Sequence, residues 1–116
     1  MEPIKVANVG DIDDEEAIVV PAEQTGTGHP IAVFHVGDEF FAIDDECTHE
    51  VASLGDGYIE GDVVECPLHS AKFSLRTGEA LTLPASRPVC THTVEVRGDE
   101  VWLYPGKAVP GAAVAS

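Results

Sequence analysis

Two short stretches of the chain each place one cysteine beside one histidine. Residues 47–49 are Cys-Thr-His, and residues 66–69, which follow after a gap of 16 residues (50–65), are Cys-Pro-Leu-His. Thiolates and imidazoles bind zinc and iron–sulfur clusters, so two of each suit either a structural zinc ion or a mixed-ligand [2Fe–2S] cluster. The sequence therefore predicts one metal centre built from two loops.

The way the ligand types divide between the two stretches bears on which metal is bound. Zinc ribbons and fingers usually pair like with like, as C-x2–4-C and H-x3–5-H. Here each stretch contributes one Cys and one His, which would let a two-iron cluster take Cys47 and Cys66 on one iron and His49 and His69 on the other. The spacing favours the cluster, and a zinc-binding interaction module remains the alternative.

Short β-type runs separated by Gly-containing turns must position these residues. Gly37-Asp38-Glu39 and the same string at 98–100 each separate two apolar runs, as in a β-hairpin. Gly61-Asp62 forms a third turn that would bring both ligand stretches to one tip. No long segment has helical spacing of apolar residues, so we expect an all-β protein, an antiparallel β-sandwich or small barrel. The predicted strands are Ile4–Asn8, Ala17–Val20, Ile31–Val36, Phe40–Ile43, Tyr58–Glu60, Val63–Glu65, His92–Arg97 and Val101–Tyr104.

Length and charge narrow the functional classes. The 116 residues are enough for one domain, and six Lys plus Arg against 21 Asp plus Glu give a net charge of −15. Such a charge argues against nucleic acid and anionic membranes as partners. We see no membrane-length apolar run and no secretion signal, which predicts a cytoplasmic protein whose three cysteines serve metal ligation better than disulfides.

From about Ile31 to Tyr104 the chain resembles Rieske-type [2Fe–2S] proteins, whose signature is C-x-H, about 15–17 residues, then C-x-x-H. It is most similar to the ferredoxin components of multicomponent aromatic-ring-hydroxylating dioxygenases, in residues 57–69 and 72–78. The resemblance implies that Cys47 and Cys66 hold an inner iron and that His49 and His69 hold an outer iron near the surface.

The same resemblance implies an organisation and a function. We expect a Rieske domain over residues 1–104, with an inserted cluster-binding subdomain of two ligand loops at about 44–74, and a flexible tail over 105–116. The chain would carry one [2Fe–2S] cluster and act, as a monomer, between a flavin-dependent NAD(P)H reductase and a terminal oxygenase of aromatic hydrocarbon catabolism, without being an enzyme itself. A Rieske-like accessory subunit of another reductase, such as nitrite reductase, is the second alternative.

Four positions differ from the respiratory-complex branch of that family. Ala52 and Leu68 stand where that branch has a disulfide, and Ala71 and Phe73 stand where it has hydroxyl donors to the cluster sulfurs. Fewer donors and the excess negative charge both disfavour the reduced state, which predicts a reduction potential at the low end of the Rieske range, about −150 mV.

Other residues near the ligands have less specific interpretations. Cys90-Thr91-His92 repeats the first ligand string, and we interpret it as a small buried cysteine and a strand-end histidine, not as a second ligand pair. Acidic residues beside the first stretch predict either a solubilising face or a docking surface, and basic residues after the second predict partner orientation or counter-charge. These residues are Asp44, Asp45, Glu46 and Glu50, and Lys72, Arg76 and Arg87.

Overall fold

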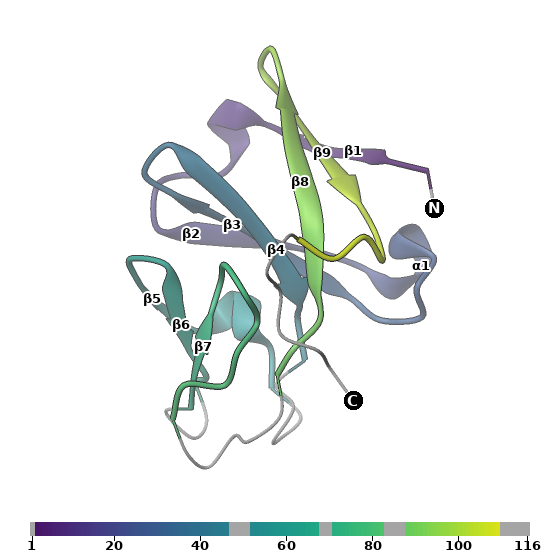
Figure 1. Cartoon of the computed structure of the whole chain (residues 1–116). Helices are drawn as coiled ribbons and strands as arrows, with labels where there is room; N and C mark the ends of the chain where they lie inside the picture. Colours follow the sequence, from purple (N-terminus) through teal and green to yellow (C-terminus); the bar gives the residue numbers. More distant parts are fainter. Residues whose placement is uncertain (1, 47–51, 68–70, 83–87, 110–116) are drawn as a thin grey trace.

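Two antiparallel sheets make up the computed structural model, which describes residues 2–46, 52–67, 71–82 and 88–109 (Figure 1). A six-stranded sheet, the base sheet, has the order β1-β9-β8-β4-β3-β2, and a three-stranded sheet, the small sheet, has the order β5-β6-β7. The base strands are β1 (Ile4–Asn8), β2 (Glu16–Val20), β3 (Ile31–Val36), β4 (Glu39–Asp44), β8 (Thr91–Arg97) and β9 (Glu100–Tyr104). The remaining elements are β5 (Tyr58–Glu60), β6 (Val63–Glu65), β7 (Lys72–Ser74), α1 (Ala22–Thr25), and the 3-10 turns η1 (Val9–Asp11) and η2 (Leu54–Asp56).

The all-β prediction is confirmed, and so are the three hairpins. β3 pairs with β4, β5 with β6 and β8 with β9, each across a turn whose glycine has a positive φ: Gly37, Gly61 and Gly98. β7 was not predicted, because three residues with a single apolar side chain show no alternation pattern. It forms by pairing with β6, which places Phe73 opposite Val64.

The base sheet curls into a half-barrel and buries apolar side chains on both faces. In β3, Ile31 and Val33 point into one core with side chains of the outer strands β1, β2 and β9, whereas Ala32 and Phe34 point into a second core. This second core is shared with the small sheet, through Val64 and other side chains, so it fixes the small sheet against the base sheet.

The small sheet is an insertion between two neighbouring base strands. β4 and β8 pair through Ala42 with His92 and Ile43 with Thr91, and the amide of Asp44 donates to the carbonyl of Cys90 at 2.9 Å. The chain therefore leaves the base sheet and returns to it at adjacent points (Figure 1).

One arginine connects the two sheets on the surface. The guanidinium of Arg76, in the turn after β7, donates to both carboxylate oxygens of Glu39 at the start of β4, at 2.9 and 2.6 Å. Its Nε donates to Asp62 in the β5–β6 turn at 2.8 Å, and the group lies over the ring of Phe41, 5.1 Å from the centroid. We call these contacts the Arg76 clamp.

The segment after β9 is hydrogen-bonded to β8 over its described part. The carbonyl of Lys107 accepts from the amide and hydroxyl of Thr93, and the amide of Val109 donates to the hydroxyl of Thr91. The rest of the predicted tail, 110–116, lies outside the described residues. Within the described ranges, no helix has the length and apolar character needed to cross a bilayer.

Candidate functional site

Cys66 follows the last residue of β6 and is buried in the second core. Side chains alternate along the strand, so Val64 and Cys66 point inward and Glu65 points outward. The Cys66 amide donates to the carbonyl of Ala71 at 2.7 Å, which joins the two ends of the loop that contains the second ligand stretch. Leu54 and Phe73 lie in the same apolar cluster, so the Cys66 thiol is shielded from water.

The first loop, which follows β4 and contains the first ligand stretch, is also closed at its base. Glu46 and Ser53 form an antiparallel bridge, and the Leu54 amide donates to the carbonyl of Asp45 at 2.6 Å. The Asp45 carboxylate, on a residue only 6% exposed, accepts hydrogen bonds from the Ser53 hydroxyl and the Gly55 amide, both at 2.8 Å. The residues on both sides of the first ligand stretch, Asp45 and Glu46 before it and Ser53 to Gly55 after it, are therefore joined to one another.

The two loop bases lie against one another. Ala52, at the end of the first loop, packs on the apolar cluster that contains Cys66 and Ala71. Gly57 lies against the carbonyl oxygen of Glu65, the residue before Cys66, where a Cβ would clash. Two loops that start side by side, one of them carrying a buried thiol, fit a single centre that takes ligands from both.

Of the four predicted ligands, the described chain contains Cys66. Cys47, His49 and His69 lie outside the described residues, as does Leu68. Ala71 and Phe73 are described, and both side chains are fully buried next to Cys66. Apolar side chains therefore lie beside Cys66 at the two positions where the respiratory-complex branch has hydroxyl donors.

Cys90 and His92 form a hydrogen-bonded group with Asp44. His92 is buried; its Nε2 lies 2.8 Å from Asp44 Oδ1, and its Nδ1 accepts the Gly106 amide at 2.8 Å. Because an amide can only donate, Nδ1 is unprotonated and Nε2 carries the hydrogen. Both nitrogens are used within the fold, which supports the structural interpretation of His92.

The predicted burial of Cys90 is wrong. The residue precedes β8, which starts at Thr91, so the sheet does not cover it and it is exposed. Partial desolvation of the thiol, and then the nearby carboxylate of Asp44, raise the pKa of Cys90 above its ordinary value.

The charged residues near the loops divide into structural and surface groups. Asp45 is an internal acceptor and Asp44 is bonded to His92, so neither belongs to a solvated acidic face. Glu46 is exposed, with an oxygen 3.9 Å from His29 Nδ1. Arg76 is engaged in its clamp, which agrees with a counter-charge role. Glu50 and Arg87 lie outside the described residues.

The structural role of Asp45 was missed by the sequence interpretation. Its partners, Ser53 and Gly55, follow eight and ten residues later, beyond any local capping pattern. The only signal was a carboxylate at the end of an apolar strand followed by a Ser-x-Gly string, which is not specific.

Comparison with known proteins gives a consistent result. A family model described as Rieske [2Fe-2S] domain matches residues 2–96. The 3-phenylpropionate/cinnamic acid dioxygenase ferredoxin subunit of Escherichia coli K12 is 43% identical over 111 residues, which cover 95% of this chain and 100% of that protein.

Solved structures agree with this match. The ferredoxin of carbazole 1,9a-dioxygenase from Nocardioides aromaticivorans IC177 superposes with a TM-score of 0.82 at 30% identity, covering 90% of this chain and 99% of that one. A chain in a complex of reduced oxygenase and oxidized ferredoxin in carbazole 1,9a-dioxygenase gives 0.83 at 36% identity, covering 92% and 95%.

Proposed function

This chain belongs to the Rieske [2Fe-2S] domain family, and we propose that it passes single electrons from a flavin-dependent NAD(P)H reductase to a terminal aromatic-ring-hydroxylating oxygenase. It is an electron-transfer component of the ferredoxin type, with one [2Fe–2S] cluster per chain. The bound cluster supplies reversible uptake of one electron. The observation that carries the proposal is the buried Cys66 at a closed loop, in a chain that matches a ferredoxin subunit over 95% of its own length.

The proposed ligands are Cys47 and Cys66 for the inner iron and His49 and His69 for the outer iron. Two features support this set: the Cys66 thiol points into the core, and Ala52, beside the first ligand stretch, packs on the apolar cluster that contains Cys66 and Ala71. In this arrangement the protein shields the sulfur side of the site.

The partners follow from the relatives. A chain 36% identical to this one belongs to a solved complex of oxygenase and ferredoxin, which supports a terminal oxygenase as the acceptor here. We also propose a flavin-dependent reductase as donor, a monomeric carrier, a domain of residues 1–104, and the cytoplasm as its compartment. The odd number of cysteines, three, supports metal ligation in a reducing compartment.

Anaerobic reconstitution with iron and sulfide tests the cluster. We expect a red-brown protein that gives a rhombic electron paramagnetic resonance signal when reduced, whereas a zinc-binding module would give neither. A colourless, iron-free product would contradict the proposed function.

A His69→Cys variant tests the ligand set. The added thiolate charge disfavours reduction, so a variant that assembles its cluster should have a sharply lower potential by protein-film voltammetry. Cys90→Ser is the matched control, because it changes a cysteine outside the proposed set and should leave the potential unchanged. An unchanged potential in His69→Cys would contradict His69 as a ligand.

A further inference from the structure

Four side chains form a row across the outer face of the small sheet. Tyr58 pairs with Glu65, Glu65 pairs with Lys72, and the Leu81 amide donates to the carbonyl of Lys72 at 2.7 Å. Their neighbours Ile59, Val64 and Phe73 point toward the core, so these four point away from it. We call them the outer row. Glu65 directly precedes Cys66, so the outer row crosses the sheet at its ligand-bearing end.

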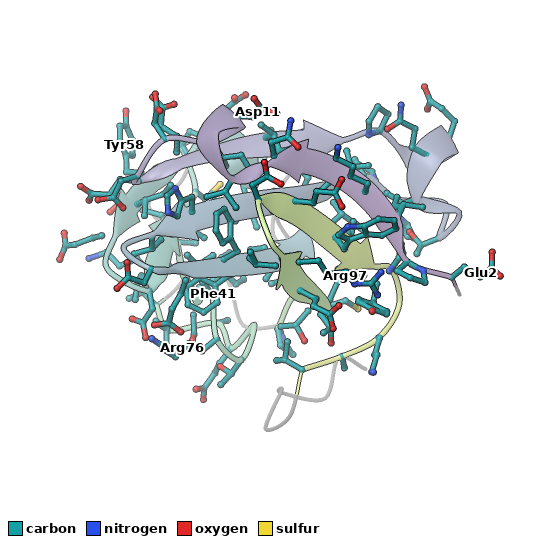
Figure 2. The ribbon with its side chains drawn as sticks, turned by 90° about the horizontal axis from the view of Figure 1, so that it is seen from above. Glu2, Asp11, Phe41, Tyr58, Arg76 and Arg97 are labelled. Atoms are coloured by element: carbon teal, nitrogen blue, oxygen red, sulfur yellow. The ribbon has the colours of Figure 1, made fainter. Side chains whose placement is uncertain are left out.

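The two ends of the outer row are apolar and exposed. Tyr58 is 67% exposed and projects from the edge of the molecule, and Leu81 is 45% exposed (Figure 2). Between them lies a shallow hollow of about 190 Å³, which Ile59 and Val63 also line. An exposed aromatic ring beside a hollow is typical of a protein-contact surface.

The margin of the outer row is acidic. Glu60 and Glu65 line the hollow, and Lys72 is its only basic lining residue within the described chain. Ile59 also borders a neighbouring depression lined by Glu15, Glu16 and Asp56. A partner that covers the row therefore gains from basic side chains around an apolar centre.

The area of an electron-transfer contact requires a surface beyond the ligand loops. Such interfaces bury up to about 1,200 Å² in total, which takes roughly 15 residues from each protein. The two loops that contain the proposed ligands, 47–52 and 66–71, comprise twelve residues. The contact must extend onto neighbouring surface, and the outer row, which is apolar at both ends, adjoins Cys66 through Glu65.

We propose that the outer row is a docking surface for the terminal oxygenase, which presents an apolar site for Tyr58 and Leu81 and basic residues toward Glu60 and Glu65. This inference rests on the proposed function. The solved oxygenase–ferredoxin complex is the reason for choosing the acceptor over the reductase.

Binding and electron transfer are measured with reconstituted protein and two probes, the oxygenase and the reductase of the E. coli 3-phenylpropionate/cinnamic acid dioxygenase system. The variants are Tyr58→Ala and Leu81→Ala. The matched control is Val96→Ala, since Val96 is also 45% exposed but lies in the β8–β9 hairpin at the opposite end of the molecule (Figure 1). We expect each test variant to bind immobilised oxygenase at least tenfold more weakly and the control to bind within twofold of wild type.

A charge reversal tests the acidic margin. Glu60→Lys should weaken oxygenase binding at low ionic strength and reduce its dependence on salt, because it removes an attraction that salt screens. Asp99→Lys, in the exposed β8–β9 turn, is the control with the same charge change. The visible spectrum should be the same in all these variants, and the potential and the rate of reduction by dithionite should be the same in Tyr58→Ala, Leu81→Ala and Val96→Ala.

Three results would contradict the inference in different ways. Oxygenase binding like wild type in both Tyr58→Ala and Leu81→Ala would show that the row is not a docking surface. Loss of reductase-dependent reduction with oxygenase binding intact would assign the row to the donor instead. Wild-type protein that holds its cluster but exchanges electrons with neither probe would contradict the proposed function itself.

Discussion

At the scale of single residues, Asp45 fixes the base of the first loop from inside the protein. Its carboxylate accepts two hydrogen bonds and its backbone carbonyl accepts a third, from residues on the returning side of the loop. The side chain thus determines where the segment that follows β4 begins and ends.

Removing the Asp45 carboxylate should loosen this loop. Asp45→Ala leaves the Ser53 hydroxyl and the Gly55 amide without their acceptor, at a cost of about 2–3 kcal/mol in the free energy of unfolding. Asp45→Asn keeps an acceptor oxygen and should lose less. Denaturant unfolding and the half-time of cluster loss to a chelator check both, and equal behaviour of the two variants would argue against this role.

The Cys90 thiol should react slowly although the residue is exposed. Because its pKa is raised, the thiol stays protonated at neutral pH, and alkylation by iodoacetamide should accelerate only in the alkaline range. Asp44→Asn removes the nearby negative charge, so its alkylation profile should shift to lower pH. The folded state favours the protonated thiol. The resulting contribution to the free energy of unfolding is fully present below the pKa of Cys90 in the unfolded chain, and it is lost as pH rises through the pKa in the folded protein. A profile unaffected by Asp44→Asn would contradict the assigned cause.

At the scale of elements, the Arg76 clamp joins two sheets that otherwise meet through apolar side chains. Arg76 bonds the turn after β7 to the β5–β6 turn and to the start of β4. Its hydrogen bond holds the pKa of Glu39 below the ordinary value of 4.5.

Arg76→Gln should allow the small sheet to separate more readily from the base sheet. We expect the melting temperature at pH 7 to fall by a few degrees, which corresponds to the free energy of one surface ion pair, and the cluster to be lost faster. The folded state lowers the Glu39 pKa, so the clamp contributes above pH 4.5 and its contribution is lost as pH falls through the folded value.

Arg97→Gln provides the comparison for this variant. Arg97 bonds Glu95 and Tyr104 within the β8–β9 hairpin, so its loss should not affect cluster retention. Cluster loss that is equally fast in both variants would show that the clamp has no special role.

The distance along the chain between interacting residues explains which features the sequence predicted and which it did not. The hairpins at Gly37, Gly61 and Gly98 depend on adjacent residues, so local turn chemistry was sufficient to find them. The partners of Arg76 are 14 and 37 residues away, and no local pattern marks them. At the candidate site, spacing predicted the ligand set, which stays a prediction, whereas the exposure of Cys90 depends on where β8 begins and no local pattern marked it.

At the scale of the whole molecule, the net negative charge and the scarcity of hydrogen-bond donors beside Cys66 both lower the predicted reduction potential. The net charge of −15 and the apolar side chains of Ala71 and Phe73 beside Cys66 both disfavour an added electron. We expect a reduction potential of about −150 mV by protein-film voltammetry, becoming less negative as salt screens the charge. A potential above zero would refute this prediction.

The insertion of the small sheet between β4 and β8 also bears on how such proteins diversify. Asp44 and Cys90 flank the inserted segment, and one backbone hydrogen bond joins them. A replacement segment would have to span that short gap and cover Ala32, Phe34 and Ile43 to leave the strand pairings of the base sheet in place. The length of the inserted segment is therefore set by the cluster ligands and by the core it covers, and not by the strand pairing of β4 with β8.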